Sequence, residues 1–139
     1  MKINAMGIFS ECKTSKDQGN IGLAKAIYEL QLLGYRVSVP ITENQKYDLI
    51  CDKDDKLNRV QIKTTKHTSV NKSNCYKVNL RTLGGNQSYH TAKKRAVGDY
   101  ELLYVLTDNN TSYLIPDDAF KNGNNLSLNK EMEKYIINF

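Results

Sequence analysis

A short acidic run, Asp52-Lys53-Asp54-Asp55-Lys56, separates two segments that each have the alternating pattern of a β-strand. The first segment covers residues 47–51 and the second covers residues 57–64. A polar run rich in Asp favours a tight turn between two strands, so the pattern predicts an antiparallel hairpin. A chain built around such a hairpin contains a sheet, which excludes a helix bundle.

The centre of the turn fixes the register of the predicted hairpin. With the turn centred between the last two aspartates, the expected pairs are Asp48 with Gln61, Leu49 with Val60, and Ile50 with Arg59. Alternation along the second strand then places Gln61 and Lys63 on one face and Val60 and Ile62 on the other. Asp48, Gln61 and Lys63 are therefore expected on one side of the hairpin, while Val60 and Ile62 enter the core.

An acid, an amide and an amine on one strand face suit the hydrolysis of a phosphodiester. Mg²⁺ prefers oxygen ligands, which the Asp48 carboxylate, the Gln61 side-chain carbonyl and the Ile62 backbone carbonyl can supply. Lys63 can hold the attacking water or offset charge in the transition state. The simpler interpretation is the solvated face of a half-buried strand, and the spacing alone favours it.

The remaining sequence predicts one long helix before the hairpin. A helix is expected over residues 17–33, because apolar residues recur there at spacings of three and four, at Leu23, Ala24, Ile27 and Leu30. Ser15 or Asp17 can cap its start, and Gly34 stands where a helix commonly ends.

Further strands are expected at residues 35–39, 75–80, 101–107 and 112–115. Residues 81–98 form a long polar segment without apolar periodicity, and Pro116 suits the start of a short helix. The tail, residues 130–139, reads as helix or strand. The order predicts an α/β or α+β fold, in which a mixed central sheet has a covering N-terminal helix and a minor C-terminal helix.

Length and charge narrow the possible functions. A chain of 139 residues can bury one core, so we expect a single domain over residues 1–139. It has no membrane span and no signal-peptide pattern, which predicts a cytoplasmic protein. Its three cysteines lack the spacing of a zinc site. The net charge of +5 favours a polyanionic partner.

Basic residues are frequent after Lys63 and are candidate contacts to a DNA backbone. Asn86, beside the Gly84-Gly85 turn, is a candidate for reading base edges. The basic candidates are Lys66, His67, Lys72, Arg81, Lys93, Lys94 and Arg95. The alternative for the triplet at 93–95 is a solvated surface run.

Several segments form a specific combination when they are considered together. They are residues 19–27, 34–37, 47–50 and 60–65, with 81–86 and the Leu114-Ile115-Pro116 ending. This combination resembles the PD-(D/E)xK endonucleases associated with group I introns, a homing-endonuclease branch of the restriction-endonuclease-like fold. The resemblance spans residues 19–116. It implies cleavage of double-stranded DNA with Mg²⁺ or Mn²⁺, with Asp48, Gln61 and Lys63 as the catalytic residues.

One departure from this family concerns the first helix, where many nucleases of the fold carry a glutamate that points into the site. Leu23 takes that position here, so Asp48 is the one clear carboxylate of the expected site. Metal affinity without DNA should then be weak. A non-catalytic DNA-binding module is therefore an alternative, as are a Holliday-junction resolvase and a restriction endonuclease of the same fold. Because one domain presents one active site, cutting both strands implies a homodimer or homotetramer.

Overall fold

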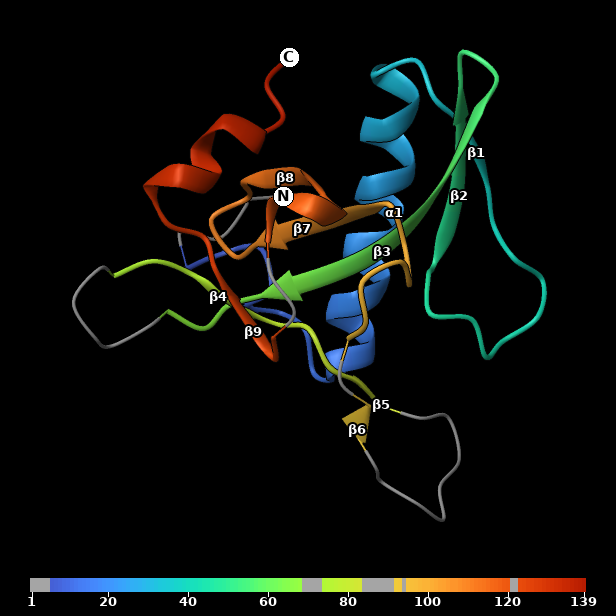
Figure 1. Cartoon of the computed structure of the whole chain (residues 1–139). Coiled ribbons are helices and arrows are strands. Elements are labelled where there is room, and N and C mark those ends of the chain that lie inside the picture. Colours follow the sequence, from blue (N-terminus) through green and yellow to red (C-terminus); the bar gives the residue numbers. More distant parts are fainter. Residues whose placement is uncertain (1–5, 69–73, 84–91, 94, 121–122) are drawn as a thin grey trace.

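The computed structural model describes residues 6–68, 74–83, 92–93, 95–120 and 123–139 (Figure 1). Its centre is a five-stranded sheet of order β1-β2-β3-β7-β8. These strands are β1 (Arg36–Ser38), β2 (Leu49–Lys53), β3 (Lys56–Thr65), β7 (Leu102–Thr107) and β8 (Ser112–Pro116). β3 and β7 pair in parallel and the other neighbours are antiparallel, so the sheet is mixed as expected.

The hairpin of β2 and β3 has the predicted turn and register. Asp54 and Asp55 both adopt left-handed conformations, with φ of 52° and 60°. Two such residues form the tight turn that matches the twist of the flanking strands. Leu49 pairs with Val60, which confirms the predicted register in this part of the hairpin.

The long helix α1 (Ser15–Leu32) begins with a capping box that the sequence analysis did not assign. Its N-cap is Thr14, rather than Ser15 or Asp17. The Thr14 hydroxyl accepts the Asp17 N–H at 3.1 Å, and the Asp17 carboxylate accepts the Thr14 N–H at 3.1 Å. Beyond the helix, Gly34 has a φ of +88°, which favours glycine at a helix end.

One face of the sheet is covered by α1, and the green strand β3 crosses in front of this blue helix in Figure 1. The helix buries Ala26 and Leu30, whereas Ala24 is exposed. The expectation that Ala24 belongs to the buried face is therefore wrong. Five buried sheet residues share this core: Leu49, Cys51, Val60, Tyr104 and Leu106.

The opposite face is covered by the C-terminal part of the chain. There β4 (Lys77–Asn79) pairs with β9 (Asn125–Ser127), a strand that the sequence analysis did not predict. Pro116 precedes the short 3₁₀ helix η1 (Asp117–Ala119), and the tail forms the 3₁₀ helix η2 (Lys130–Tyr135). This second core contains Val78, Leu103, Val105, Tyr113, Ile115, Leu126 and Met132.

Two further strands, β5 (Thr82–Leu83) and β6 (Ala92–Lys93), pair within the segment that was expected to be irregular. None of the helices in the described part of the chain is both long and apolar enough to cross a membrane.

Candidate active site

The ladder between β2 and β3 ends beside Asp48. The Asp48 N–H donates to the Val60 carbonyl at 2.8 Å, although Val60 is already the ladder partner of Leu49. The expected ladder pair of Asp48 with Gln61 is therefore not formed, and the backbone shifts by one position there. β3 continues to Thr65 without β2 beside it, so this edge of the strand is open.

The carboxylate of Asp48 is held against the backbone of β3. Its Oδ2 accepts the Ile62 N–H at 2.7 Å and the Gln61 side-chain N–H at 2.7 Å. The same Gln61 amide nitrogen donates to the Ile62 carbonyl at 3.2 Å. The structure thus gathers the three groups that the sequence analysis assigned to a metal.

This arrangement fits a cation with oxygen ligands. The Asp48 carboxylate and the Ile62 carbonyl both accept hydrogen bonds from one partially positive nitrogen of Gln61. A half turn of the Gln61 amide about its last bond would present the oxygen instead, because the two ends of an amide are nearly the same shape. Gln61 is only 7% exposed, so its amide stays beside Asp48.

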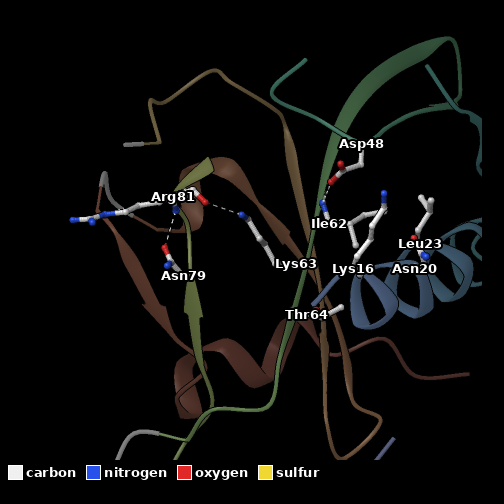
Figure 2. Close-up of a pocket in the computed structure, with 10 residues that line it drawn as sticks. Lys16, Asn20, Leu23, Asp48, Ile62, Lys63, Thr64, Asn79 and Arg81 are labelled. Atoms are coloured by element: carbon white, nitrogen blue, oxygen red, sulfur yellow. Dashed lines mark hydrogen bonds between the residues drawn. The ribbon is translucent and has the colours of Figure 1, made fainter. Parts of the chain in front are cut away.

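Lys63 faces the same pocket from β3. Its ammonium group donates to the Arg81 carbonyl at 2.9 Å, and Figure 2 shows the side chain extending toward Arg81. Burial lowers the pKa of Lys63, and the nearby Asp48 carboxylate partly opposes this effect. Burial also raises the pKa of Asp48, while the Ile62 N–H and Lys63 act in the opposite direction.

Asp48 and Lys63 line a cavity of about 630 Å³ between α1, β3 and the segment after β4. Within this lining Asp48 is the one carboxylate, beside three basic side chains. The lining residues are Lys16, Gly19, Asn20, Leu23, Asp48, Ile62, Lys63, Thr64, Asn79 and Arg81.

The helix approaches this pocket closely at Gly22. A Cβ atom added to Gly22 would lie 2.5 Å from Cγ2 of Thr64, so only glycine lets α1 come this near to β3. The Gln18 amide also donates to the Thr64 hydroxyl at 2.9 Å. Leu23 consequently lines the pocket, where its side chain cannot bind a metal.

Other acids near Asp48 in sequence do not enter the pocket. Glu29 is buried elsewhere and accepts hydrogen bonds from Tyr104 at 2.7 Å and Ser112 at 3.1 Å. Glu43 lines a separate cavity of about 250 Å³ that also borders Asp48. In the described part of the chain, no three His, Cys, Asp or Glu residues are grouped to hold a metal.

The sequence model of the PD-(D/E)XK endonuclease family matches residues 13–136. The chain belongs to the PD-(D/E)XK endonuclease family. It is also similar to the solved structure of a bacterial homing endonuclease, I-Ssp6803I, with a TM-score of 0.69 and 23% sequence identity. The match covers 83% of this chain and 78% of that chain, and it confirms the expected fold. A comparison with curated protein sequences gives no significant match.

The expected DNA contacts of this PD-(D/E)XK endonuclease lie in different environments. Lys66 and His67 follow β3 and are exposed, and Arg81 is exposed at the pocket. Lys72, Asn86 and Lys94 lie outside the described residues, as does the side chain of Lys93.

Arg95 does not suit the role that the sequence analysis gave it. Its side chain is buried, forms an ion pair with Asp117, and has its guanidinium carbon 5.2 Å from the Tyr100 ring centroid and 4.2 Å from that of Phe120. A guanidinium enclosed in this way is not available to a phosphate, so the expected DNA contact of Arg95 does not agree with the structure.

Lys16 and Asn20 also line the pocket of this endonuclease from α1, and neither was predicted from the sequence. The available signal was their spacing, because positions 16, 20 and 23 recur at four and three residues and share one helix face. Leu23 had already been placed at the site, so this spacing points to both residues.

Proposed function

We propose that this chain hydrolyses phosphodiester bonds in double-stranded DNA with the help of a divalent cation bound beside Asp48. The convergence of the Asp48 carboxylate, the Gln61 amide and the Ile62 carbonyl carries this proposal, together with the pocket that Asp48 and Ile62 line with Lys63. The homing endonuclease with a similar structure supports cleavage at a specific site as the biological activity. We also propose that residues 1–139 form a single nuclease domain and that it acts in the cytoplasm.

Asp48, Gln61 and Ile62 would hold the cation, for which Mg²⁺ is the first choice and Mn²⁺ the second. When bound, such an ion supplies positive charge that polarises the scissile phosphate. The site offers one carboxylate and neutral oxygens, so we expect weak metal binding in the absence of DNA.

Lys63 acts on the attacking water in this proposal. Because burial lowers its pKa, the neutral amine is more accessible than in an exposed lysine. The neutral amine can accept the proton that the water loses as its oxygen attacks phosphorus and the bond to the leaving oxygen breaks. The Arg81 carbonyl positions the Lys63 amino group at 2.9 Å.

Oligomerisation is part of the same proposal. The described residues of one chain form one such pocket around Asp48, and cutting both DNA strands requires two sites related by symmetry. We therefore propose a homodimer or homotetramer, which light scattering after size-exclusion chromatography measures directly. A monomer at all concentrations that still cuts both strands in one binding event would contradict it.

A non-catalytic DNA-binding module is the second candidate, and Leu23 in the pocket favours it. The two candidates share the fold and differ only in chemistry. DNA binding without cleavage under all metal conditions would support this alternative.

The decisive experiment incubates the purified full chain with supercoiled plasmid and four-way-junction DNA, in Mg²⁺, Mn²⁺ or EDTA. Asp48→Asn is compared with Asp118→Asn, which changes an exposed aspartate that does not line the pocket. We expect metal-dependent cutting that Asp48→Asn reduces at least about 100-fold and Asp118→Asn leaves unchanged. Cutting by Asp48→Asn at the wild-type rate would contradict the proposal.

Unfolding of the mutant does not confound this comparison. The pKa of Asp48 is raised in the native state, so ionising this carboxylate at neutral pH destabilises the fold. Asn keeps an oxygen that accepts the Ile62 N–H. We therefore expect the melting temperature of Asp48→Asn to equal or exceed that of the wild type.

A further inference from the structure

The open edge of β3 presents backbone donors to the pocket. The Ile62 N–H points to this edge, because it donates to Asp48 rather than to β7. Backbone groups alternate in direction along a strand, so the Thr64 N–H points the same way. No residue of β2 lies opposite Thr64, since the ladder ends at Leu49 and Val60. The pocket therefore has a backbone N–H beside the Asp48 cluster that can bind an anion.

α1 faces this edge with a basic and a neutral polar side chain. Lys16 and Asn20 line the pocket one helical turn apart, and Leu23 follows them on the same face. The contacts of Thr64 with Gly22 and Gln18 fix the distance between this face and β3. The helix side of the pocket thus carries a cation at Lys16, and the residues that line it from α1 include no carboxylate.

Lys16 has no partner among the residues that the structure describes. It forms no hydrogen bond or ion pair there, whereas Lys25 on the same helix binds both Asn110 and Glu29. Figure 2 shows Lys16 extending from α1 alongside Ile62, toward the part of the pocket that contains Asp48. Lys63 reaches the pocket from the other face of β3, so the two lysines approach it from different directions.

We infer that Lys16 binds a non-bridging oxygen of the scissile phosphate, with the Thr64 N–H beside it, an inference that rests on the proposed function. The one carboxylate that the described residues contribute to the pocket suits one divalent cation, not the pair that two-metal nucleases use to neutralise both sides of the phosphate. Lys16 supplies positive charge on the helix side in place of a second cation. A lysine suits this position, because its compact ammonium group on a flexible stem binds phosphate as a point charge.

The first test measures binding of the full chain to a fluorescent random-sequence duplex in EDTA, as a function of salt concentration. Lys16→Ala is compared with Lys16→Arg and with Lys130→Ala, which removes an exposed lysine away from the pocket. Loss of one phosphate contact should make the negative slope of log K (the association constant) against log salt shallower by about 0.9. This change weakens binding about eightfold at 0.1 M salt. We expect this for Lys16→Ala alone. Equal slopes for Lys16→Ala and the wild type would overturn the inference.

The second test measures single-turnover plasmid cleavage at saturating protein with Mg²⁺. We expect Lys16→Ala to cut at least about tenfold more slowly than the wild type, and Lys16→Arg to retain most of the rate. Weaker binding with an unchanged rate would overturn the assignment to the scissile phosphate. Failure of the proposed function gives a different result, because then the wild type itself does not cut and only the binding assay reports on Lys16.

Discussion

The side-chain nitrogen of Gln61 lies 2.7 Å from Oδ2 of Asp48. A carboxylate in place of this amide would repel the Asp48 carboxylate. With a neutral partner, Asp48 is the one negatively charged residue among the described residues that line the pocket. Because like charges in contact raise each other's pKa, an acid at position 61 would need a bound cation to stay ionised. The amide avoids this repulsion in the metal-free protein, and it leaves the metal site with few anionic ligands.

A glutamate introduced on the helix should strengthen metal binding. Leu23→Glu places a carboxylate in the pocket, while Ala24→Glu places one on the exposed face of the same helix and serves as the control. We expect Leu23→Glu to raise the affinity for Mn²⁺ about tenfold, because an anionic oxygen ligand is added. Isothermal titration calorimetry without DNA measures this change. Equal gains for the two variants would show that only net charge matters.

Metal binding should depend on pH through Asp48. Its pKa is raised mainly by burial, so protonation begins at a higher pH than for an ordinary carboxylate, and Mn²⁺ affinity should fall correspondingly early on acidification. Lys63→Met removes a charge that lowers this pKa, so the midpoint should move to higher pH. Mn²⁺ titrations between about pH 4 and 8 measure both midpoints. A midpoint that moves to lower pH in Lys63→Met would contradict the assignment to Asp48.

The parts of this structure that were predictable from sequence are those set by local patterns. The turn at Asp54 and Asp55 fixed the hairpin, and the hairpin placed Gln61 and Lys63 on one strand face. The end of the ladder at Asp48 was not predictable in the same way, because it depends on the side-chain hydrogen bond of Asp48 to Ile62. Pairing of β3 with β7 joins distant segments, which leaves no local signal in the sequence.

Charge alone also gave a wrong expectation for Arg95. In the sequence it belongs to a basic triplet, and only tertiary contacts show its ion pair with Asp117. Lys16 shows the opposite case, since its charge alone gave no signal and only its helical spacing to Leu23 pointed to the site. Single charged residues can therefore be assigned to a surface or to a core only when their neighbours in space are known.

The close contact between α1 and β3 should make Gly22 sensitive to substitution. Gly22→Ala brings a methyl group against Thr64, and we expect it to destabilise the fold by about 1–3 kcal/mol. Gly19→Ala is the control, because nothing lies within 4 Å of a Cβ there, and better helix propensity should stabilise it by up to about 1 kcal/mol. Urea unfolding measures both changes. Thr64→Ser removes the clashing methyl but keeps the hydroxyl that binds Gln18, so it should recover part of the loss in Gly22→Ala.

The burial of Arg95 predicts a structural role that is separable from DNA binding. Arg95→Gln removes the buried guanidinium and leaves the partly buried Asp117 without its charged partner, and we expect a loss of about 3 kcal/mol in the free energy of unfolding. Below the melting temperature, its DNA affinity should keep the salt dependence of the wild type, because no phosphate contact is lost. Arg81→Gln, at the pocket, should instead make the salt dependence of DNA binding shallower and leave the free energy of unfolding nearly unchanged. Fluorescence anisotropy at several salt concentrations, combined with urea unfolding, distinguishes the two variants. A reduced salt slope in folded Arg95→Gln would show that the guanidinium reaches DNA after all.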